Sequence, residues 1–406
     1  MPSWTARLIL AASLVFIACA SRGADPSQVE RGKYLATAAD CFACHTDPEA
    51  PIAYAGGRGV RTPFGTVVSA NITPDEVTGI GRWTDTQFDQ AVRFGKRADG
   101  AHLYPAMPYP YFRKLTREQV QDIRAYLNTV PAARQDRPPN ALPFPFNIRP
   151  LLAVWNALFF HDQPFAPNAA QNAAWNRGAW LVQGPGHCAA CHTPKNFLGG
   201  DKRDAALQGY ALQGWVAPDI TRNAARGLAH WSGDDMLAFL RSGHNTSAAA
   251  GGPMKEVVED STSKLSDADL QAMTAYLISL ASNTTLPGAV PATDPLMKAG
   301  AAIFGDLCSA CHAQRGSGVP YMIPDLAASP AVAARDSDGV VHVLLYGGQS
   351  AATQAEPTGP AMPSYSDFLT DEQLAAVATY VRNSWGHGAK PTLVSEIRKA
   401  RKHPEG

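Results

Sequence analysis

Three copies of the pentapeptide Cys-x-x-Cys-His constrain this chain of 406 residues more than any other feature. The spacing places two thiols about one helical turn apart, and an imidazole follows directly after the second thiol. Each copy is therefore expected to present three reactive groups on one short helical turn. The copies contain six of the seven cysteines, which are Cys41, Cys44, Cys188, Cys191, Cys308 and Cys311.

This pentapeptide is the attachment sequence of c-type haem. Each thiol adds to one vinyl group of the haem, and the adjacent imidazole then reaches the iron from one face. Three CxxC disulfides or three zinc sites would use the same residue types, but neither explains why histidine follows at once in every copy. The sequence therefore predicts three covalently bound c-type haems, with His45, His192 and His312 as iron ligands.

One methionine at a repeated position follows each haem sequence. Met107 and Met254 each lie 62 residues after the preceding haem histidine, and Met362 lies in a Pro-Ala-Met-Pro sequence that also surrounds Met107. Flanking prolines stiffen the backbone, so a thioether held there loses little entropy when it binds iron. We expect these three methionines to be the second axial ligands, as in electron-transfer cytochromes. The competing candidates are His102, His244 and His342.

Helix signals also recur around each haem sequence. Segments that begin at Thr116, Ser266 and Thr370 pair a hydroxyl N-cap with an acid or amide three residues later, and leucine precedes each cap. A glycine in the helical pattern before each haem sequence permits close crossing of the first and last helices. These glycines are Gly32, Gly178 and Gly300.

Together, these repeats resemble the class I cytochrome c fold. The resemblance implies an all-α protein made of three tandem class I cytochrome c domains with covalently bound haem. We place the domains at residues 21–130, 171–282 and 295–388. A proline-rich linker with a short helix occupies 131–170, a second linker occupies 283–294, and a basic C-terminal tail occupies 389–406.

The N-terminus predicts export. A single basic residue, Arg7, precedes an apolar run from Leu8 to Ala20, and Ala18-Cys19-Ala20 fits the small-x-small cleavage pattern. The run is shorter than the roughly 20 residues that span a bilayer, so residues 1–20 are predicted to be a signal peptide. We expect the mature protein in the periplasm or on the periplasmic face of the inner membrane. Lipidation of Cys19 is the alternative.

Charge and motif content exclude several functions. The 35 Lys and Arg residues balance the 35 Asp and Glu residues, so no net field attracts nucleic acid. No hydrolase, metalloprotease, phosphate-loop or dinucleotide motif is present, and we expect no catalytic residues. The apolar run 151–160 predicts a helix between domains, with docking on a partner or the membrane surface as the alternative. The charge of residues 389–406 is typical of a solvated end.

Longer motifs resemble the triheme cytochrome c subunit of bacterial membrane-associated alcohol, gluconate, sorbitol and fructose dehydrogenases. They include Asn71-Ile-Thr-Pro-Asp75, Gly79-Ile-Gly-Arg-Trp83-Thr84, His102-Leu-Tyr-Pro-Ala-Met-Pro-Tyr109, Asn147-Ile-Arg-Pro150, Gly252-Pro-Met254 and Gly359-Pro-Ala-Met-Pro363. Members of that family often carry an amphipathic or hydrophobic C-terminal attachment segment, where this chain has a short basic tail.

The resemblance implies an electron-transfer subunit with no substrate site of its own. Such a subunit takes electrons from a catalytic dehydrogenase subunit that contains PQQ or FAD. It passes them through its haems toward ubiquinone, a terminal oxidase or the respiratory chain, with peripheral membrane association. Two other functions fit the same motifs: a free-standing periplasmic shuttle, and a peroxidase-like haem enzyme, which would need one iron without a sixth ligand.

Overall fold

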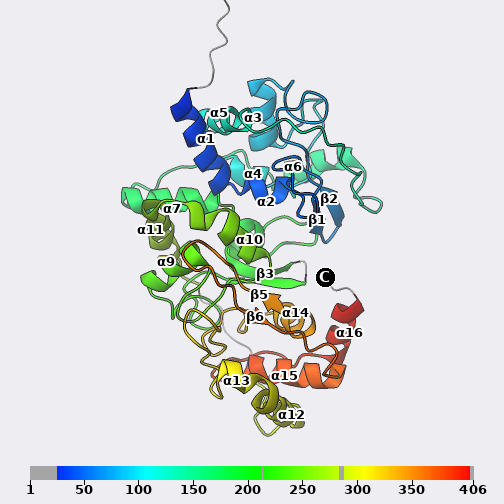
Figure 1. Cartoon of the computed structure of the whole chain (residues 1–406), viewed down its shortest axis with the longest axis vertical. Helices are drawn as coiled ribbons and strands as arrows, with labels where there is room; N and C mark the ends of the chain where they lie inside the picture. Colours follow the sequence, from blue (N-terminus) through cyan, green and yellow to red (C-terminus); the bar gives the residue numbers. More distant parts are fainter. Residues whose placement is uncertain (1–24, 213, 283–287, 403–406) are drawn as a thin grey trace, which may run out of the picture.

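A computed structural model describes residues 25–212, 214–282 and 288–402. Within these ranges the chain is largely helical and forms three units that follow one another along the longest axis of the molecule (Figure 1). The predicted signal peptide, Cys19 and the first residues of the linker 283–294 lie outside the described residues. Among the residues that are described, no helix is long and apolar enough to cross a membrane.

Unit one, residues 25–130, begins and ends with helices that pack against each other, α1 and α5. A short antiparallel hairpin, which the sequence did not predict, follows its haem sequence. The elements are α1 (Pro26–Ala38), α2 (Cys41–His45), β1 (Gly59–Thr62), β2 (Gly65–Val68), α3 (Asp85–Phe94), α4 (Tyr109–Phe112) and α5 (Arg117–Leu127).

Unit two, residues 173–282, repeats this order, with a hairpin again after the haem sequence. The elements are α7 (Ala173–Gln183), α8 (Ala189–His192), η2 (Arg203–Ala205), β3 (Gln208–Leu212), β4 (Trp215–Asp219), α9 (Gly233–Ser242), α10 (Pro253–Asp260), η3 (Thr262–Lys264) and α11 (Asp267–Leu277).

Unit three, residues 288–402, is also mainly helical, but its paired strands β5 and β6 have only two residues each. One of these residues is Met362. Its elements are α12 (Pro295–Ile303), the π-helical turn η4 (Phe304–Cys308), α13 (Ser309–His312), α14 (Asp338–Tyr346), β5 (Gly348–Gln349), β6 (Ala361–Met362), α15 (Asp371–Asn383) and α16 (Val394–Lys402).

The predicted starts of the last helix in each unit are confirmed. Thr116 Oγ1 accepts from the backbone N–H of Gln119 at 3.2 Å, and the Gln119 side chain accepts from the backbone N–H of Thr116 at 2.9 Å. The same reciprocal pair forms between Thr370 and Gln373. Ser266 caps α11 through its hydroxyl. These bonds satisfy N–H groups that the first turn of a helix leaves without partners.

The predicted role of the repeated glycines is also confirmed. A Cβ added at Gly32 would lie 1.8 Å from the backbone oxygen of Asp122 on α5. Equivalent atoms at Gly178 and Gly300 would lie 1.8 Å and 2.2 Å from backbone oxygens of the facing helices α11 and α15. A side chain at one of these glycines would therefore push apart α1 and α5, α7 and α11, or α12 and α15, respectively.

Units one and two share one continuous hydrophobic core, whereas unit three has its own. Polar contacts also cross the boundary between units one and two. Tyr34 of unit one donates to the Asp269 carboxylate of unit two at 2.6 Å, and Trp180 Nε1 donates to the backbone oxygen of Lys114 at 3.2 Å. The first two units are therefore one packed body, which the sequence repeat does not reveal.

The proline-rich linker lies against unit one and enters a helix between the units. Thr66 and Ala141 exchange two backbone hydrogen bonds, which ties the linker to β2. The linker continues into η1 (Arg149–Leu151) and α6 (Leu152–Phe159). Tyr109 of unit one donates to Asn156 on α6 at 2.7 Å, and Trp155 Nε1 donates to the backbone oxygen of Leu198 in unit two at 2.9 Å. α6 therefore contacts both units, but none of its residues is buried, and Val154 and Leu158 are more than half exposed.

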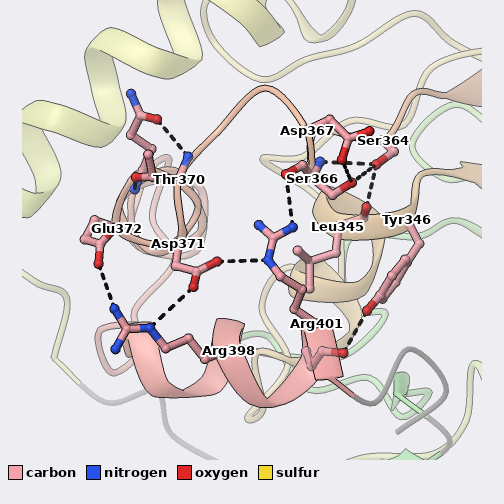
Figure 2. A network of polar contacts seen from close by, with 12 residues as sticks. Leu345, Tyr346, Ser364, Ser366, Asp367, Thr370, Asp371, Glu372, Arg398 and Arg401 are labelled. Atoms are coloured by element: carbon pink, nitrogen blue, oxygen red, sulfur yellow. Dashed lines mark hydrogen bonds and ion pairs between the residues drawn. The ribbon is translucent and has the colours of Figure 1, made fainter.

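The expectation of a solvated end is wrong for residues 394–402, which form α16 and dock on unit three. Ile397 is fully buried among residues of the core of unit three. Arg401 Nε contacts the Asp371 carboxylate at 3.0 Å, and Arg398 pairs with Asp371 and Glu372 (Figure 2). One apolar residue and two acids at the start of α15 are sufficient to anchor a short segment that is otherwise basic.

Candidate functional site

Each haem sequence folds as the expected helical turn. The turns are α2 in unit one, α8 together with the preceding Cys188 in unit two, and α13 together with Cys308 in unit three. The six cysteines of these turns are not joined in disulfides. Two free thiols and one imidazole therefore lie on the same short turn in every unit.

Each haem-sequence histidine is held by a backbone oxygen from a later segment, which is a loop in units one and three and the end of β4 in unit two. A carbonyl only accepts, so Nδ1 of each ring donates and the Nε2 lone pair is free to bind a metal. Burial lowers the pKa of all three rings, which keeps them neutral as iron requires. The pairs and their Nδ1–O distances are His45–Ala70 at 2.7 Å, His192–Pro218 at 2.7 Å and His312–Pro324 at 3.3 Å.

An Asn or Asp directly after each of these carbonyls shapes the loop. Asn71 Oδ1 accepts from the backbone N–H of Thr73 at 2.9 Å, and Asp219 Oδ1 accepts from that of Thr221 at 2.8 Å. Asp325 Oδ1 makes the equivalent contact in unit three. Asn71 and Asp219 occupy equivalent places in the first two units, but the sequence predicted no role for either residue. The signal was weak because unit three places its Asp only 13 residues after its histidine, against 26 in unit one.

The three predicted methionines occupy related places in their units. Met107 lies just before α4, and Met254 is the second residue of α10. Met362 lies in β6, where it pairs with Gly348 of β5. All three are half-buried and pack against hydrophobic clusters of the protein. Each methionine is thus held by core packing at the end of an element or in a short strand.

The competing histidines lie in three different environments. His102 Nδ1 accepts from the Asn156 side chain of α6 at 3.0 Å. The ring of His342 stacks on Trp215 of unit two, with the ring centroids 4.2 Å apart. His244 is fully buried, and its Nε2 has no hydrogen-bond partner among the residues that the structure describes. His244 is therefore the strongest competitor of Met254 in unit two.

A cavity of about 1740 Å³ opens beside the second haem sequence. Its wall includes Ala189 and Ala190 from between the two cysteines, together with Tyr210 and Leu212 of β3. The apolar side of α6 forms another part of the wall. This volume exceeds the roughly 300–1,000 Å³ of ordinary small-molecule sites, but the described wall includes none of Cys188, Cys191, His192 and Met254.

The first and second haem sequences lie close together at the boundary of units one and two. Burial raises the pKa of the Cys44 thiol to about 12, and Asp40 and the Cys191 thiol of unit two add smaller contributions. Asp40 has a left-handed backbone and is itself buried. Burial raises its pKa to about 7, with further contributions from Asp260 and Glu256 of α10. A carboxyl that titrates near neutral pH therefore lies beside both haem sequences.

These residues fit covalently bound haem. The thiols are free, and each buried imidazole donates from Nδ1 to a backbone oxygen, which leaves Nε2 free to bind a metal. A cavity with an apolar wall lies beside the second haem sequence. In the described ranges, no three His, Cys, Asp or Glu side chains gather as a metal site. A haem would bring four nitrogen ligands of its own, so the chain would have to supply only the remaining ligands of the iron.

Known proteins share these features over almost the whole chain. The family model for cytochrome c matches residues 29–131, 175–281 and 297–385. The gluconate 2-dehydrogenase cytochrome c subunit of Pantoea cypripedii is 38% identical over 411 residues, which covers 95% of this chain and 93% of that protein. The cytochrome c subunit of the quinone alcohol dehydrogenase of Gluconacetobacter polyoxogenes is 39% identical, with 93% and 85% covered.

A third relative, the fructose dehydrogenase cytochrome subunit of Gluconobacter japonicus, is 35% identical and covers 92% of this chain and 82% of its own length. The resemblance predicted from the sequence motifs is therefore confirmed. The chain belongs to the cytochrome c family and carries covalently bound c-type haem.

Proposed function

We propose that this chain is the electron-transfer subunit of a membrane-associated dehydrogenase complex. The observation that carries the proposal is 35–39% identity, over nearly the full length, with cytochrome c subunits of gluconate, alcohol and fructose dehydrogenases. In this role the chain takes electrons from a catalytic subunit that contains PQQ or FAD. It delivers them toward ubiquinone or a terminal oxidase at the periplasmic face of the inner membrane.

The proposed haem sites follow the repeats, one in each of three tandem class I cytochrome c domains. Bound haem supplies one-electron iron chemistry. In every site two thiols would hold the group covalently, and one imidazole and one thioether would bind the iron. The sites are Cys41, Cys44, His45 and Met107; Cys188, Cys191, His192 and Met254; and Cys308, Cys311, His312 and Met362.

The chain's own residues restrict these sites to electron transfer. A histidine and a methionine that both bound the iron would leave it no coordination position for peroxide, oxygen or substrate. The backbone oxygen that accepts from each Nδ1–H holds the ring in one orientation, as for His45 and Ala70. Little rearrangement is then needed when an electron arrives or leaves. This favours an electron carrier over a peroxidase-like enzyme.

The arrangement of the units supports transfer along the chain. The first and second haem sequences lie close together within one packed body. Unit three contacts unit two through the stacked rings of His342 and Trp215 and through a backbone bond from Ala351 N–H to the oxygen of Ala250. The leader pattern of residues 1–20 supports export to the periplasm.

Purification of the native protein from its host in mild detergent tests the proposal. Mass spectrometry identifies co-eluting proteins, and dye reduction is assayed with alcohols, sugars and aldonates. We expect a large quinoprotein or flavoprotein dehydrogenase to co-elute and to reduce the haems when its substrate is added. Recovery of the trihaem protein alone in the soluble periplasmic extract, with no dehydrogenase partner at any detergent concentration, would contradict it and favour a free shuttle.

A further inference from the structure

One guanidinium group bridges the first haem sequence and α10, the helix that carries Met254. Arg58 lies in the loop that leads into β1, and the backbone of this loop pairs with Ser69, next to the Ala70 oxygen that holds His45. Its side chain extends across the boundary between units one and two. It contacts the haem-attachment turn of the first site and the helix that carries Met254 of the second site.

The first contact is with the haem-attachment turn α2. Arg58 Nη1 donates to the backbone oxygen of Ala43 at 2.7 Å, and Ala43 lies between Cys41 and Cys44. The turn ends at His45, so no later helical N–H is available to donate to this oxygen. The guanidinium therefore satisfies a backbone group of the attachment sequence and lies beside the first haem.

The second contact is with α10. Arg58 Nη2 donates to both carboxylate oxygens of Glu256, at 2.7 Å and 3.0 Å, and Glu256 is two residues after Met254. The far end of α10 is held from unit three, because Glu259 accepts from the backbone N–H of Ala352 at 2.7 Å. The position of α10, and with it that of Met254, is thus fixed from both neighbouring units.

The charges of Arg58, Glu256 and their neighbours act on the first haem. The other charged groups here are Asp40, Asp260 and Lys264, and only about a quarter of the Arg58 side chain is exposed. Oxidation adds one positive charge to a haem iron. A fixed positive charge nearby disfavours the ferric form and raises the reduction potential, whereas a fixed negative charge lowers it.

We propose that Arg58 and Glu256 together couple the first two haem sites. Arg58 raises the potential of the first haem through its charge, and the Arg58–Glu256 pair positions α10 so that Met254 reaches the second iron. This inference rests on the proposed haem ligands and adds two residues that tune and position them. Neither residue touches a haem sequence cysteine or histidine through its own side chain, so both are positioning residues.

The test measures the reduction potentials of the holoprotein by optical titration, together with the far-red charge-transfer absorption of methionine-ligated ferric haem. We expect Arg58→Met to lower the potential of the first haem and to weaken the part of the absorption that comes from Met254. Glu256→Gln, which keeps size and shape, raises the potential of the first haem and also weakens that absorption. Arg58→Lys restores the charge but offers one nitrogen in place of Nη1 and Nη2, which contact Ala43 and Glu256, so we expect the potential to recover and the absorption to stay reduced.

Arg241→Met is the matched control. Arg241 pairs with Asp267 at 2.7 Å on the surface of unit two, so its loss changes the net charge equally without a contact to either haem site. We expect its potentials and absorption to match wild type. The double variant of Arg58→Met and Glu256→Gln should return the potential of the first haem close to its original value, because the two charge effects oppose each other.

Equal potentials in Arg58→Met, Glu256→Gln and the wild type, with three haems bound, would overturn the coupling and leave the proposed function intact. Shifts of the same sign in Arg58→Met and Glu256→Gln would also overturn it. A wild-type protein that lacks the methionine absorption altogether would instead overturn the axial ligands of the proposed function. The measurement needs no dehydrogenase partner, so the two failures are distinguishable.

Discussion

A single methyl group at the crossing of α12 and α15 should destabilise unit three. In Gly300→Ala, the new Cβ would lie 2.2 Å from the backbone oxygen of Ala376 and 2.6 Å from the Cβ of Tyr380, where ordinary contacts are 3.4–4 Å. Neither atom is the end of a flexible side chain. The two helices must therefore separate by roughly 1 Å to restore normal contact.

The magnitude follows from two opposing effects. Overpacking of this kind costs about 1–3 kcal/mol, and more when rigid backbone must move. Alanine restricts the unfolded chain and favours helix, which returns about 0.4–1 kcal/mol. We expect Gly300→Ala to lower the free energy of unfolding by about 2 kcal/mol.

Gly305→Ala supplies the matched control on the same helical run. A Cβ at Gly305 meets no described atom within 4 Å, and its backbone is not left-handed. This variant should be neutral or more stable by up to about 1 kcal/mol. Urea unfolding followed by circular dichroism measures both, and hydrogen exchange of α12 and α15 locates the change. Equal stabilities of the two variants would refute the close-crossing explanation for the repeated glycines.

Two further predictions concern buried groups. Burial raises the pKa of Asp40 from 3.8 to about 7, so its ionisation costs the folded state up to about 4 kcal/mol as pH rises through this interval. In thermal unfolding, Asp40→Asn should no longer lose stability between pH 4 and 8. The same dependence of stability on pH in Asp40→Asn and wild type would contradict the burial of Asp40. Ile397→Ala should cost about 2–5 kcal/mol because Ile397 is fully buried, whereas Leu393→Ala, at a residue 57% exposed, should change stability by less than about 0.5 kcal/mol. Equal urea midpoints for these two variants would show that α16 does not dock on unit three.

Local sequence patterns predicted the parts of the fold that local physics determines. The turn at Cys41–His45, the N-cap of Thr116 and the crossing at Gly32 each depend on residues within one or two helical turns, or on the absence of a side chain. The repeat then transferred these features to all three units. The candidate ligands followed because each haem sequence carries its chemistry in five consecutive residues.

The features that sequence reasoning missed depend on contacts between distant residues. Arg398 pairs with Asp371 across 27 positions, and nothing in the basic tail indicates that it will find this partner. The core shared by units one and two is built from residues whose apolar pattern would also suit a core within a single unit, so the pattern does not distinguish the two arrangements. The oxygen of Ala70 that orients His45 belongs to the backbone, so no side-chain type marks it.

The far-red charge-transfer absorption of the ferric holoprotein tests the central claim most directly, because it reports methionine bound to haem iron. We expect wild type to show the intensity of three methionine-ligated haems. Met107→Ala, Met254→Ala and Met362→Ala should each remove about one third of it. An unchanged absorption in any of these variants would contradict the assignment of that methionine. For Met254→Ala, that result together with a changed optical spectrum of the ferric protein on replacement of His244 would show that His244 holds the second iron in place of Met254.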